Sequence, residues 1–463
     1  MNTYSGNLIT MSDSYKVTHW KQYPKGAKRV FSFFESRGGR FDTVTFFGLQ
    51  YLLRRYLSGV VVTQEKIEAA KSYFEKHFGT GAYFNEAGWD RIINVHKGVL
   101  PVLIRAVPEG MTIPVGNALM TIENTDPELP WLTNYLETLL SQVWYPTTVA
   151  TQSREMKKVI MRYLEKTGDP SLIPFKLHDF GYRGSTSVES AGLGAAAHLV
   201  NFMGTDNLAG VDVAHDYYGE PMAGFSIPAA EHSTMTSWGK NAEKDAYANM
   251  LEQFPEGLVA VVSDSYDIFH ACEKIWGEEL RKQVLSRNGT LVVRPDSGNP
   301  PEVVVRVLDI LGRVIGHTVN AKGYKLLDPH VRVIQGDGID YEMLGSVLYA
   351  LERDGWSADN VSFGSGGGLL QKMDRDTQQF AFKCSAIEIA GRGWCDVQKD
   401  PVTDPRKRSK AGRLALLKAG ETYRTVRECV LLNADDNILS PVFRDGRLLA
   451  EQTFAQIRSR ASL

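Results

Sequence analysis

Short apolar runs alternate with helix-like stretches along most of this chain. The runs cover residues 102–107, 175–177, 258–262, 291–293, 331–334 and 361–363. From residue 175 onward each run is followed by Asp, Gly, Arg or Ser, and then usually by apolar residues at helical spacing, as in 267–276, 301–311 and 341–353. Strands that alternate with helices predict a parallel sheet, either open or closed into a barrel.

The segment 364–368, Gly-Ser-Gly-Gly-Gly, lies between the last apolar run and a helix-like stretch at 369–375. Glycines let backbone N–H groups approach an anion closely, and the N-terminus of the following helix adds a favourable dipole. Two other runs end in similar segments, at 294–298 and 335–338. One Asp-Gly turn alone is more often a simple turn. The carboxyl ends of parallel strands meet, however, so three such endings predict one site for a sugar phosphate.

The two ends of the chain have a different character. Residues 1–150 are rich in aromatic side chains and contain helix-like stretches at 64–78 and 131–143, whereas the tail is basic and turn-rich before it becomes β-like. We therefore expect an α/β fold with a barrel-like catalytic core in residues 151–390. We expect residues 1–150 and 391–463 to form a second, flanking domain together.

Composition excludes several functional classes. The 463 residues include 43% hydrophobic and 23% charged residues with a formal net charge of -2, which provides no overall field to attract nucleic acid.

The four cysteines form no CxxC pair, which argues against a zinc site, and so few thiols suit a reducing compartment. Residues 1–14 lack the apolar segment of a secretion signal, and no apolar run reaches the roughly 20 residues of a membrane helix. We expect a cytoplasmic protein without a membrane partner.

Arg294 and Asp296 flank a proline at the end of one run, where an extended backbone would point both side chains to the same side. The arginine fork suits phosphate oxygens, and the aspartate can accept hydrogen bonds from ribose hydroxyls or hold Mg²⁺ through water. A local ion pair explains the two residues equally well. Asp337, between two glycines, adds a second carboxylate to the set.

Asp264 and Asp267 follow the run 258–262. Either can bind a metal or cap the next helix, and the sequence favours a cap for one of them without showing which. His232 precedes another helix-like stretch, where a histidine can bind an anion or attack a phosphate. A lone histidine is more often structural.

The segment 178–184 combines aromatic rings, a cation and two glycines. The face of Phe180 suits a planar heterocycle and Arg183 suits a phosphate, although core packing is the usual role of such a ring. Asp206 follows in a loop, where it can be a cap and nothing more. Four further candidate cations, each most simply a solvated surface charge when taken alone, are Arg37, Arg40, Arg375 and Lys383.

Taken in order, several segments resemble one known family. They are residues 13–19, 176–184, 204–206, 228–233, 262–267, 294–300, 335–338 and 363–372. Across nearly its whole length the chain resembles the nicotinamide phosphoribosyltransferases, within the type II phosphoribosyltransferases. Several long motifs in the same order are far more specific than any single glycine-rich loop.

The resemblance implies a reaction and an assembly. Nicotinamide and phosphoribosyl pyrophosphate would give nicotinamide mononucleotide and pyrophosphate, with Mg²⁺ as cofactor and ATP as a coupled energy source. The implied fold is the irregular α/β barrel of the type II enzymes beside a second α+β domain. The implied assembly is a homodimer with its active sites shared between subunits.

The resemblance also assigns residues to the nicotinamide and the sugar. Phe180 would stack on one face of the ring and Tyr15 of the partner subunit would cover the other. Asp206 would accept a hydrogen bond from the carboxamide, and Ser226 is a further implied substrate-binding residue. The residues implied at the ribose phosphate are Asp296, Gly336, Asp337, Gly366 and Gly367.

The remaining implied roles concern phosphates and metal. Arg183, His232 and Arg294 would contact phosphate, and Asp264 and Asp296 would hold the metal. His232 corresponds to a histidine that ATP phosphorylates, and with Asp296 and Asp337 it forms the implied catalytic set. Further phosphate contacts, some from the other subunit, would come from Arg375, Arg37, Arg40, Lys383, Lys399 and Lys407.

The sequence departs from the family pattern at two places, and two alternative functions remain open. Residues 34–37 read Phe-Glu-Ser-Arg where the family often has Phe-Glu-Cys-Arg, and the loop 38–44 is short, as in bacterial forms. A nicotinate or quinolinate phosphoribosyltransferase would share the architecture, but it would need a basic pocket where Asp206 is predicted. A binding or signalling protein that kept the fold and lost the chemistry is the second alternative.

Overall fold

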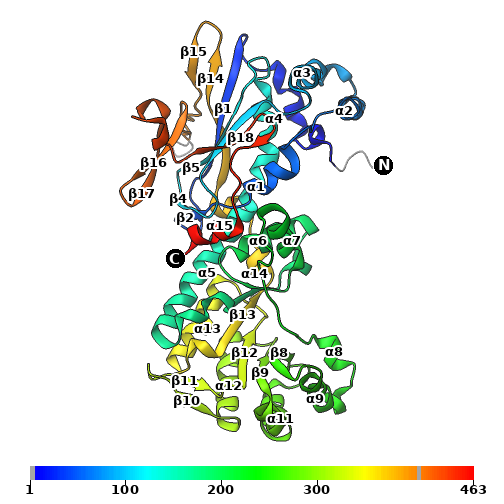
Figure 1. Cartoon of the computed structure of the whole chain (residues 1–463), viewed down its shortest axis with the longest axis vertical. Helices are drawn as coiled ribbons and strands as arrows, with labels where there is room; N and C mark the ends of the chain where they lie inside the picture. Colours follow the sequence, from blue (N-terminus) through cyan, green and yellow to red (C-terminus); the bar gives the residue numbers. More distant parts are fainter. Residues whose placement is uncertain (1–5, 404–407) are drawn as a thin grey trace. The chain divides into compact units, whose positions relative to one another are not determined.

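The computed structural model describes residues 6–403 and 408–463, which group into two compact units (Figure 1). The first unit contains Met1–Thr151, Asp216–Gly219 and Met373–Ser462. The second contains Gln152–His215 and Glu220–Lys372.

In the described part of the chain, a seven-stranded antiparallel sheet forms the centre of the first unit. Its strands, in order across the sheet, are β15 (Gly393–Asp396), β14 (Phe380–Ile389), β1 (Ala27–Ser36), β5 (Ala118–Asn124), β3 (Val102–Ala106), β18 (Ser440–Arg444) and β19 (Arg447–Leu448). Strand β14 lies inside the range 151–390 that we expected to form the barrel. It pairs with β1 instead, so residues 373–390 pack with the first unit.

Helix α2 (Gln64–Phe78) shows how local sequence sets the elements of this unit. The side chain of Thr63 accepts a hydrogen bond from the Lys66 N–H at its start, and Gly79 ends it with a φ of 69°. Helix α4 (Trp131–Ser141) packs on β1, β5 and β14. The other elements are α1 (Leu49–Leu52), α3 (Glu86–His96), α15 (Phe454–Ala461), the pair β2 (Thr43–Thr45) and β4 (Thr112–Pro114), and the pair β16 (Leu414–Ala419) and β17 (Thr422–Arg427).

Six parallel strands among the described residues form the sheet of the second unit. In order they are β7 (Gly204–Thr205), β6 (Leu177–Asp179), β13 (Val361–Ser365), β12 (Val331–Gln335), β9 (Asn288–Arg294) and β8 (Glu256–Val262). The apolar runs from residue 175 onward fall in or beside these strands. The prediction of a parallel sheet is therefore confirmed.

The segment 225–230 joins the two edges of this sheet. Phe225 pairs with Gly204 of β7, and Ala229 pairs with Ala260 of β8. The backbone hydrogen bonds are Thr205 N to Phe225 O at 3.0 Å, Ala260 N to Pro228 O at 2.9 Å and Ala230 N to Ala260 O at 2.9 Å. The curled sheet therefore closes into an irregular barrel, which confirms the predicted fold class.

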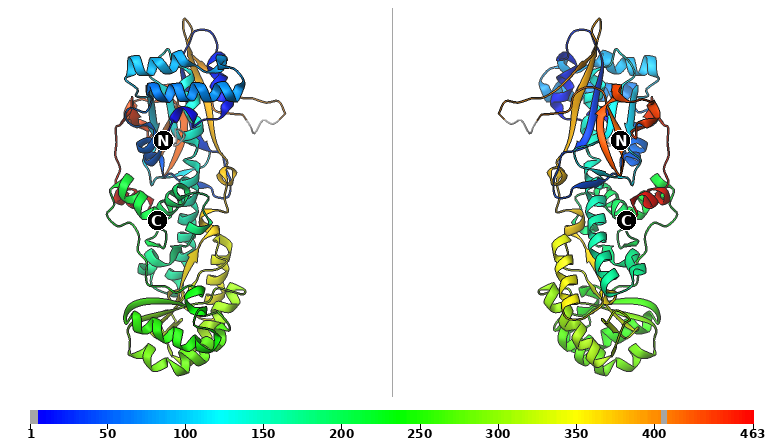
Figure 2. Two further views of the ribbon diagram at one scale, coloured as in Figure 1. Left: turned by 90° about the vertical axis from the view of Figure 1, so that its right-hand side faces the viewer. Right: turned by 90° about the vertical axis from the view of Figure 1, so that its left-hand side faces the viewer.

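Helices follow most of these strands. Helix α12 (Pro300–Val314) begins with a proline, whose missing N–H costs little in the first turn, and it packs on β12 and on α13 (Tyr341–Arg353) (Figures 1 and 2). The other α-helices and strands of the described residues are α5 (Trp144–Thr167), α6 (Val188–Leu199), α7 (Leu208–Tyr218), α8 (His232–Thr236), α9 (Glu243–Gln253), α10 (Ile268–His270), α11 (Arg281–Ser286), α14 (Gly367–Leu370), β10 (His317–Val319) and β11 (Lys325–Leu327). Among the described residues, no helix combines the length and apolar character needed to span a bilayer.

The ring of Phe180 closes one end of the barrel interior. It packs on a small cluster of Ala260, Val292 and Ile334. A Cβ atom added to Gly364 would lie 2.0 Å from the ring's Cε2, and one added to Gly336 would lie 3.3 Å from it. Glycine at 364 is therefore what allows the ring to lie flat on the end of β13.

We predict that Gly364→Ala destabilises the second unit by about 1–3 kcal/mol, because the added methyl group occupies the place of the Phe180 ring. The matched control is Gly345→Ala in α13, where the nearest atom to an added Cβ is 4.0 Å away. That change should be neutral or stabilising by up to about 1 kcal/mol, because alanine favours helix. Chemical denaturation measures both variants, and equal midpoints would contradict the steric argument.

Candidate active site at the carboxyl ends of the barrel strands

The carboxyl ends of the barrel strands carry the polar residues that the sequence singles out. In sheet order these are Asp206 after β7, Phe180 after β6, Gly366 and Gly367 after β13, Gly336 and Asp337 after β12, Arg294 and Asp296 at the end of β9, and Asp264 after β8. Because all six strands run parallel, these endings share one rim of the barrel.

A pocket of about 360 Å³ opens between the strand endings. It is lined by Phe180, Arg183, Arg294, Asp296, Gly336, Asp337, Gly338, Ile339, Gly366, Gly367, Gly368 and Lys372. Eight of these residues are predicted site residues. Lys372 is a cation that the sequence reasoning left without a role, although it follows the glycine-rich segment by four residues. The pocket thus combines two arginines, a lysine and exposed glycine backbone, which is the chemistry that binds phosphates.

A chain of ionic contacts crosses the side of this pocket. Arg294 donates two hydrogen bonds to Asp296, from Nε to Oδ1 at 3.2 Å and from Nη2 to Oδ2 at 3.0 Å. His232 Nδ1 lies 4.0 Å from Asp296 Oδ2, and His232 Nε2 lies 3.0 Å from Asp264 Oδ1. Ser297 donates to the other oxygen of Asp264 at 2.6 Å. The local ion pair that the sequence left open for Arg294 and Asp296 is therefore present.

The neighbouring carboxylates Asp264 and Asp267 have different environments. Asp267 caps α10, because its Oδ1 accepts hydrogen bonds from Phe269 N at 2.9 Å and His270 N at 3.1 Å. Asp264 is almost completely buried and contacts His232 instead. The structure therefore identifies Asp267 as the cap and leaves Asp264 at the site.

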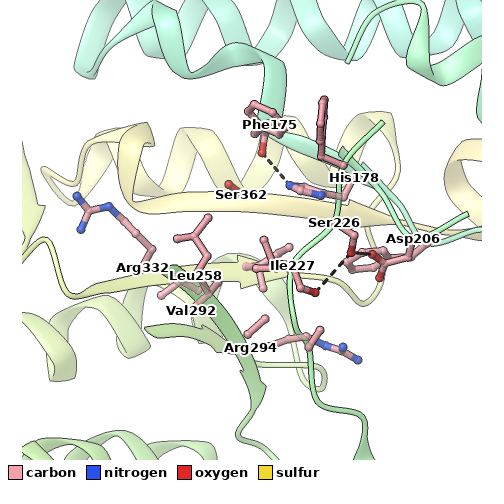
Figure 3. A pocket seen from close by; sticks show the side chains of 16 residues that line it. Phe175, His178, Asp206, Ser226, Ile227, Leu258, Val292, Arg294, Arg332 and Ser362 are labelled. Carbon is pink, nitrogen blue, oxygen red and sulfur yellow. Dashed lines mark hydrogen bonds between the residues drawn. The ribbon is translucent and has the colours of Figure 1, made fainter. Parts of the chain in front are cut away.

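A second set of residues surrounds Phe180. Ser226, on the segment that closes the barrel, donates a hydrogen bond to Asp206 Oδ1 at 2.5 Å (Figure 3). A pocket of about 690 Å³ is lined by Phe180, Arg183, Asp206, Arg294 and neighbouring residues. A third, largely apolar pocket of about 260 Å³ continues from Phe180 into the barrel interior, where Ile227 and Val292 line it (Figure 3). An aromatic face beside a hydrogen-bonded carboxylate suits a flat ring that carries an N–H donor.

The acidic residues suit a magnesium ion that is held mainly by a ligand's phosphates. Within the described ranges, no group of three or more His, Cys, Asp or Glu side chains could hold a metal ion alone. Asp264 and Asp296 are the predicted metal ligands, and all four of their oxygens already face protein donors. Mg²⁺ commonly keeps several waters and binds phosphate oxygens, so these two carboxylates would face such an ion through its waters.

Several predicted phosphate-binding cations gather in the first unit. Burial lowers the pKa of Lys383, and the nearby positive charges of Arg37, Lys399 and Arg375 lower it further. These four side chains therefore form one positively charged region, which would attract an anion. The other predicted residues here are Arg40, whose guanidinium lies 5.4 Å from the centre of the Phe41 ring, Tyr15, which is 60% exposed, and Lys407, which lies outside the described residues.

Two family models match the chain. The model described as the nicotinate phosphoribosyltransferase (NAPRTase) family matches residues 175–440, and the model of the nicotinamide phosphoribosyltransferase N-terminal domain matches residues 7–104. A nicotinamide phosphoribosyltransferase of Xanthomonas campestris is 50% identical over 467 aligned positions, which cover 99% of this chain and 98% of the relative. One of Acinetobacter baylyi is 30% identical, over 98% of this chain and 97% of the relative.

Solved structures show the same fold at low sequence identity. A nicotinate-nucleotide pyrophosphorylase from Pyrococcus furiosus has a TM-score of 0.60 at 14% identity, covering 99% of this chain and 95% of that one. Human nicotinic acid phosphoribosyltransferase has a TM-score of 0.55 at 16% identity, and the match covers 97% of this chain and 92% of the human one. With the family models and the similar sequences, this fold shows that the chain is an enzyme of the nicotinate phosphoribosyltransferase family and that it belongs to the nicotinamide phosphoribosyltransferases within it.

Proposed function

We propose that this enzyme transfers the phosphoribosyl group of phosphoribosyl pyrophosphate to nicotinamide. The products are nicotinamide mononucleotide and pyrophosphate, and the reaction serves the recovery of nicotinamide for NAD synthesis. The observation that carries the proposal is the carboxylate of Asp206, hydrogen-bonded to Ser226 beside the Phe180 ring. A carboxylate accepts from the –NH₂ of an amide and repels the carboxylate of nicotinic acid.

Base binding follows from these contacts. The nicotinamide ring lies against Phe180, and its carboxamide donates to Asp206. Ser226 fixes one oxygen of Asp206 and leaves the other for the substrate. Tyr15 of the partner subunit covers the second face of the ring. Its exposed side chain is consistent with a role in a homodimer.

The sugar phosphate occupies the 360 Å³ pocket. Exposed glycine backbone at Gly336, Gly366 and Gly367 faces its phosphate, and Asp296 and Asp337 accept hydrogen bonds from the ribose. The pyridine nitrogen adds to C1 from the face opposite to pyrophosphate, through a transition state with cationic character at C1. The protein needs to form no covalent bond, so it acts by holding C1 against the ring nitrogen and by neutralising the leaving group.

Cations stabilise the departing pyrophosphate. Arg183, Arg294 and Lys372 line the pocket. In the proposed homodimer, the positively charged region formed by Arg37, Lys383, Lys399 and Arg375 is assigned to further phosphate contacts, some of them across the dimer, with additional contacts from Arg40 and Lys407. Mg²⁺ beside Asp264 and Asp296 supplies Lewis-acid neutralisation of the same charge when it is bound.

His232 couples ATP to the reaction. Its Nε2 faces Asp264, which is fixed by Ser297, so a proton on Nε2 leaves Nδ1 as the nitrogen that can attack phosphorus. In this proposal Nδ1 accepts the γ-phosphoryl group, ADP leaves, and water later releases phosphate. The ring is 45% exposed, which leaves room for the nucleotide.

A product assay with nicotinamide and nicotinic acid in parallel, each with and without ATP, tests the function. We expect nicotinamide mononucleotide as the main product and more of it with ATP. Preferential formation of the nicotinic acid product would assign the enzyme to the other branch of its family. Absence of any product would support a protein that kept the fold and lost the chemistry.

Asp206→Asn is predicted to lower kcat/KM for nicotinamide about ten- to a hundredfold, because a charge-assisted hydrogen bond contributes about 1.5–3 kcal/mol. Activity with nicotinic acid should fall less or rise, so the preference for the amide relaxes. The control is Asp212→Asn, which removes an exposed carboxylate of α7. An unchanged ratio of amide to acid activity in Asp206→Asn would refute this role.

His232→Ala should abolish the stimulation by ATP while leaving part of the ATP-independent synthesis. The expected direct evidence is acid-labile ³²P on wild-type protein after incubation with γ-labelled ATP, and none on His232→Ala. Incubation with α-labelled ATP is the matched control, since only the γ-phosphoryl group is transferred. Wild-type protein that never acquires label on histidine would contradict the proposal.

A further inference from the structure

The buried carboxyl group of Asp179, at the end of β6, has no role in the mechanism above. Its side chain is completely buried. Oδ1 accepts a hydrogen bond from Gly181 N at 2.7 Å, whereas Oδ2 is buried and has no hydrogen-bond partner among the described residues. The Asn207 side chain lies beside this carboxyl group, and Asn207 Oδ1 is likewise buried without a partner. An ionised carboxylate left in this state would be costly, because an unpaired buried charge loses its hydration.

Asp179 is also tied to both residues that hold the base in the proposed function. It directly precedes Phe180, whose N–H donates to Ser365 O at 3.0 Å, and its own carbonyl accepts a hydrogen bond from Asp206 N at 3.0 Å. The Asp179 side chain holds the turn at Gly181, where an added Cβ would lie 2.9 Å from Oδ1. A change in the Asp179 carboxyl group therefore reaches both the aromatic face and the specificity carboxylate.

Charges around the site favour a proton on Asp179. Burial raises its pKa to about 7 and the negative charge of Asp206 adds to this effect, whereas the hydrogen bond from Gly181 N–H and the adjacent Asn207 side chain favour the ionised form. The titratable groups on β6, η6 (Tyr182–Gly184), α6 and the segment directly after α14 include His178, Tyr182, Arg183, Glu189, His198 and Lys372, and none of them is among the causes that shift the pKa of Asp179. Of two neighbouring carboxyl groups, the buried one retains its proton and the exposed one carries the charge.

We propose that Asp179 is a neutral carboxylic acid that positions Phe180 and Asp206, so that Asp206 presents the single negative charge to the base. The proton on Oδ2 supplies a donor on the side of Asn207, whose Oδ1 is buried without a partner among the described residues, and Oδ1 of Asp179 keeps the hydrogen bond to Gly181 N. Loss of that proton places a second charge behind Asp206. The proposal refines the proposed function, because it explains what keeps the amide-recognising carboxylate in place.

Asp179→Asn is the central test, because asparagine imitates the protonated acid. It retains an acceptor for Gly181 N and a donor beside Asn207 Oδ1, and it cannot ionise. In the wild type, nicotinamide affinity should fall about fivefold between pH 7 and pH 8, as a group with a pKa of about 7 loses its proton. In Asp179→Asn this component of the pH profile should be missing while kcat near pH 7 is retained. Identical pH profiles in the two proteins would overturn the proposal.

The linkage between pH and stability provides a readout that needs no substrate. The pKa of Asp179 is raised from 3.8 to about 7, so its favourable contribution to folding is present in acid, is lost as pH rises through this window, and changes no further above about 7. Wild type should therefore lose stability relative to Asp179→Asn across this range.

Asp169→Asn is the matched control. Asp169 also accepts an N–H from two residues ahead, from Ser171 at 2.9 Å, but it is exposed, and this hydrogen bond lowers its pKa. Because the pKa of Asp169 is lowered, wild type should gain stability relative to Asp169→Asn as pH rises, which is the opposite of the change expected for Asp179→Asn.

Infrared spectroscopy observes the proton directly. Wild type labelled with ¹³C-aspartate should show a protonated carboxyl band that titrates with a midpoint of about 7 and is missing in Asp179→Asn. If the variant fails to fold, the titration of the wild-type band decides alone, and a midpoint near the normal value of aspartate overturns the proposal. If wild type does not bind nicotinamide at all, the function proposed above fails, while the infrared and stability results still decide the state of Asp179.

Discussion

The closure of the parallel sheet by residues 225–230 is the constraint on which the site depends. Backbone hydrogen bonds join this segment to β7 on one side and to β8 on the other. The same segment carries Ser226 to Asp206 and leads directly to His232, which contacts Asp264. One irregular stretch therefore aligns two parts of the rim, the pocket beside Phe180 and the contact between His232 and Asp264. A sheet with open edges would leave these parts attached only to separate strands.

Several charged groups at this rim are paired within the protein itself. Arg294 holds Asp296, and Ser297 and His232 hold Asp264. Such pairs fix side-chain orientation, and the cost of ordering these groups is met during folding rather than during binding. Asp179 differs from these pairs, since its Oδ2 is buried and has no hydrogen-bond partner among the described residues. A proton on this oxygen would remove the cost of burying an unpaired charge.

The sequence predicts the rim well because strand endings are local signals. Apolar runs that end in glycine, arginine or aspartate place Arg294, Asp296 and Asp337 correctly around one pocket. Sequence alone could not decide between cap and ligand for Asp264 and Asp267, because that choice depends on His232, which lies on a different segment. It also missed the closing segment, since residues 225–230 contain a proline and pair only through isolated bridges rather than as a regular strand. The sequence analysis also missed the pairing of β14 with β1. These two strands are far apart in the sequence, and such a pairing leaves no local pattern.

The interleaved path of the chain has a consequence for synthesis. The first unit pairs β1 with β14 and β3 with β18, so its sheet needs strands separated by more than 300 positions, whereas the barrel uses the intervening stretch. A ribosome delivers residues in order, and contacts distant in sequence form slowly. The barrel can thus fold on the nascent chain before β14 and β18 are synthesised. Until then, the edges of β1 and β3 that pair with these two strands stay unpaired. A polypeptide truncated before β14 would keep these edges unpaired, and unpaired strand edges favour aggregation.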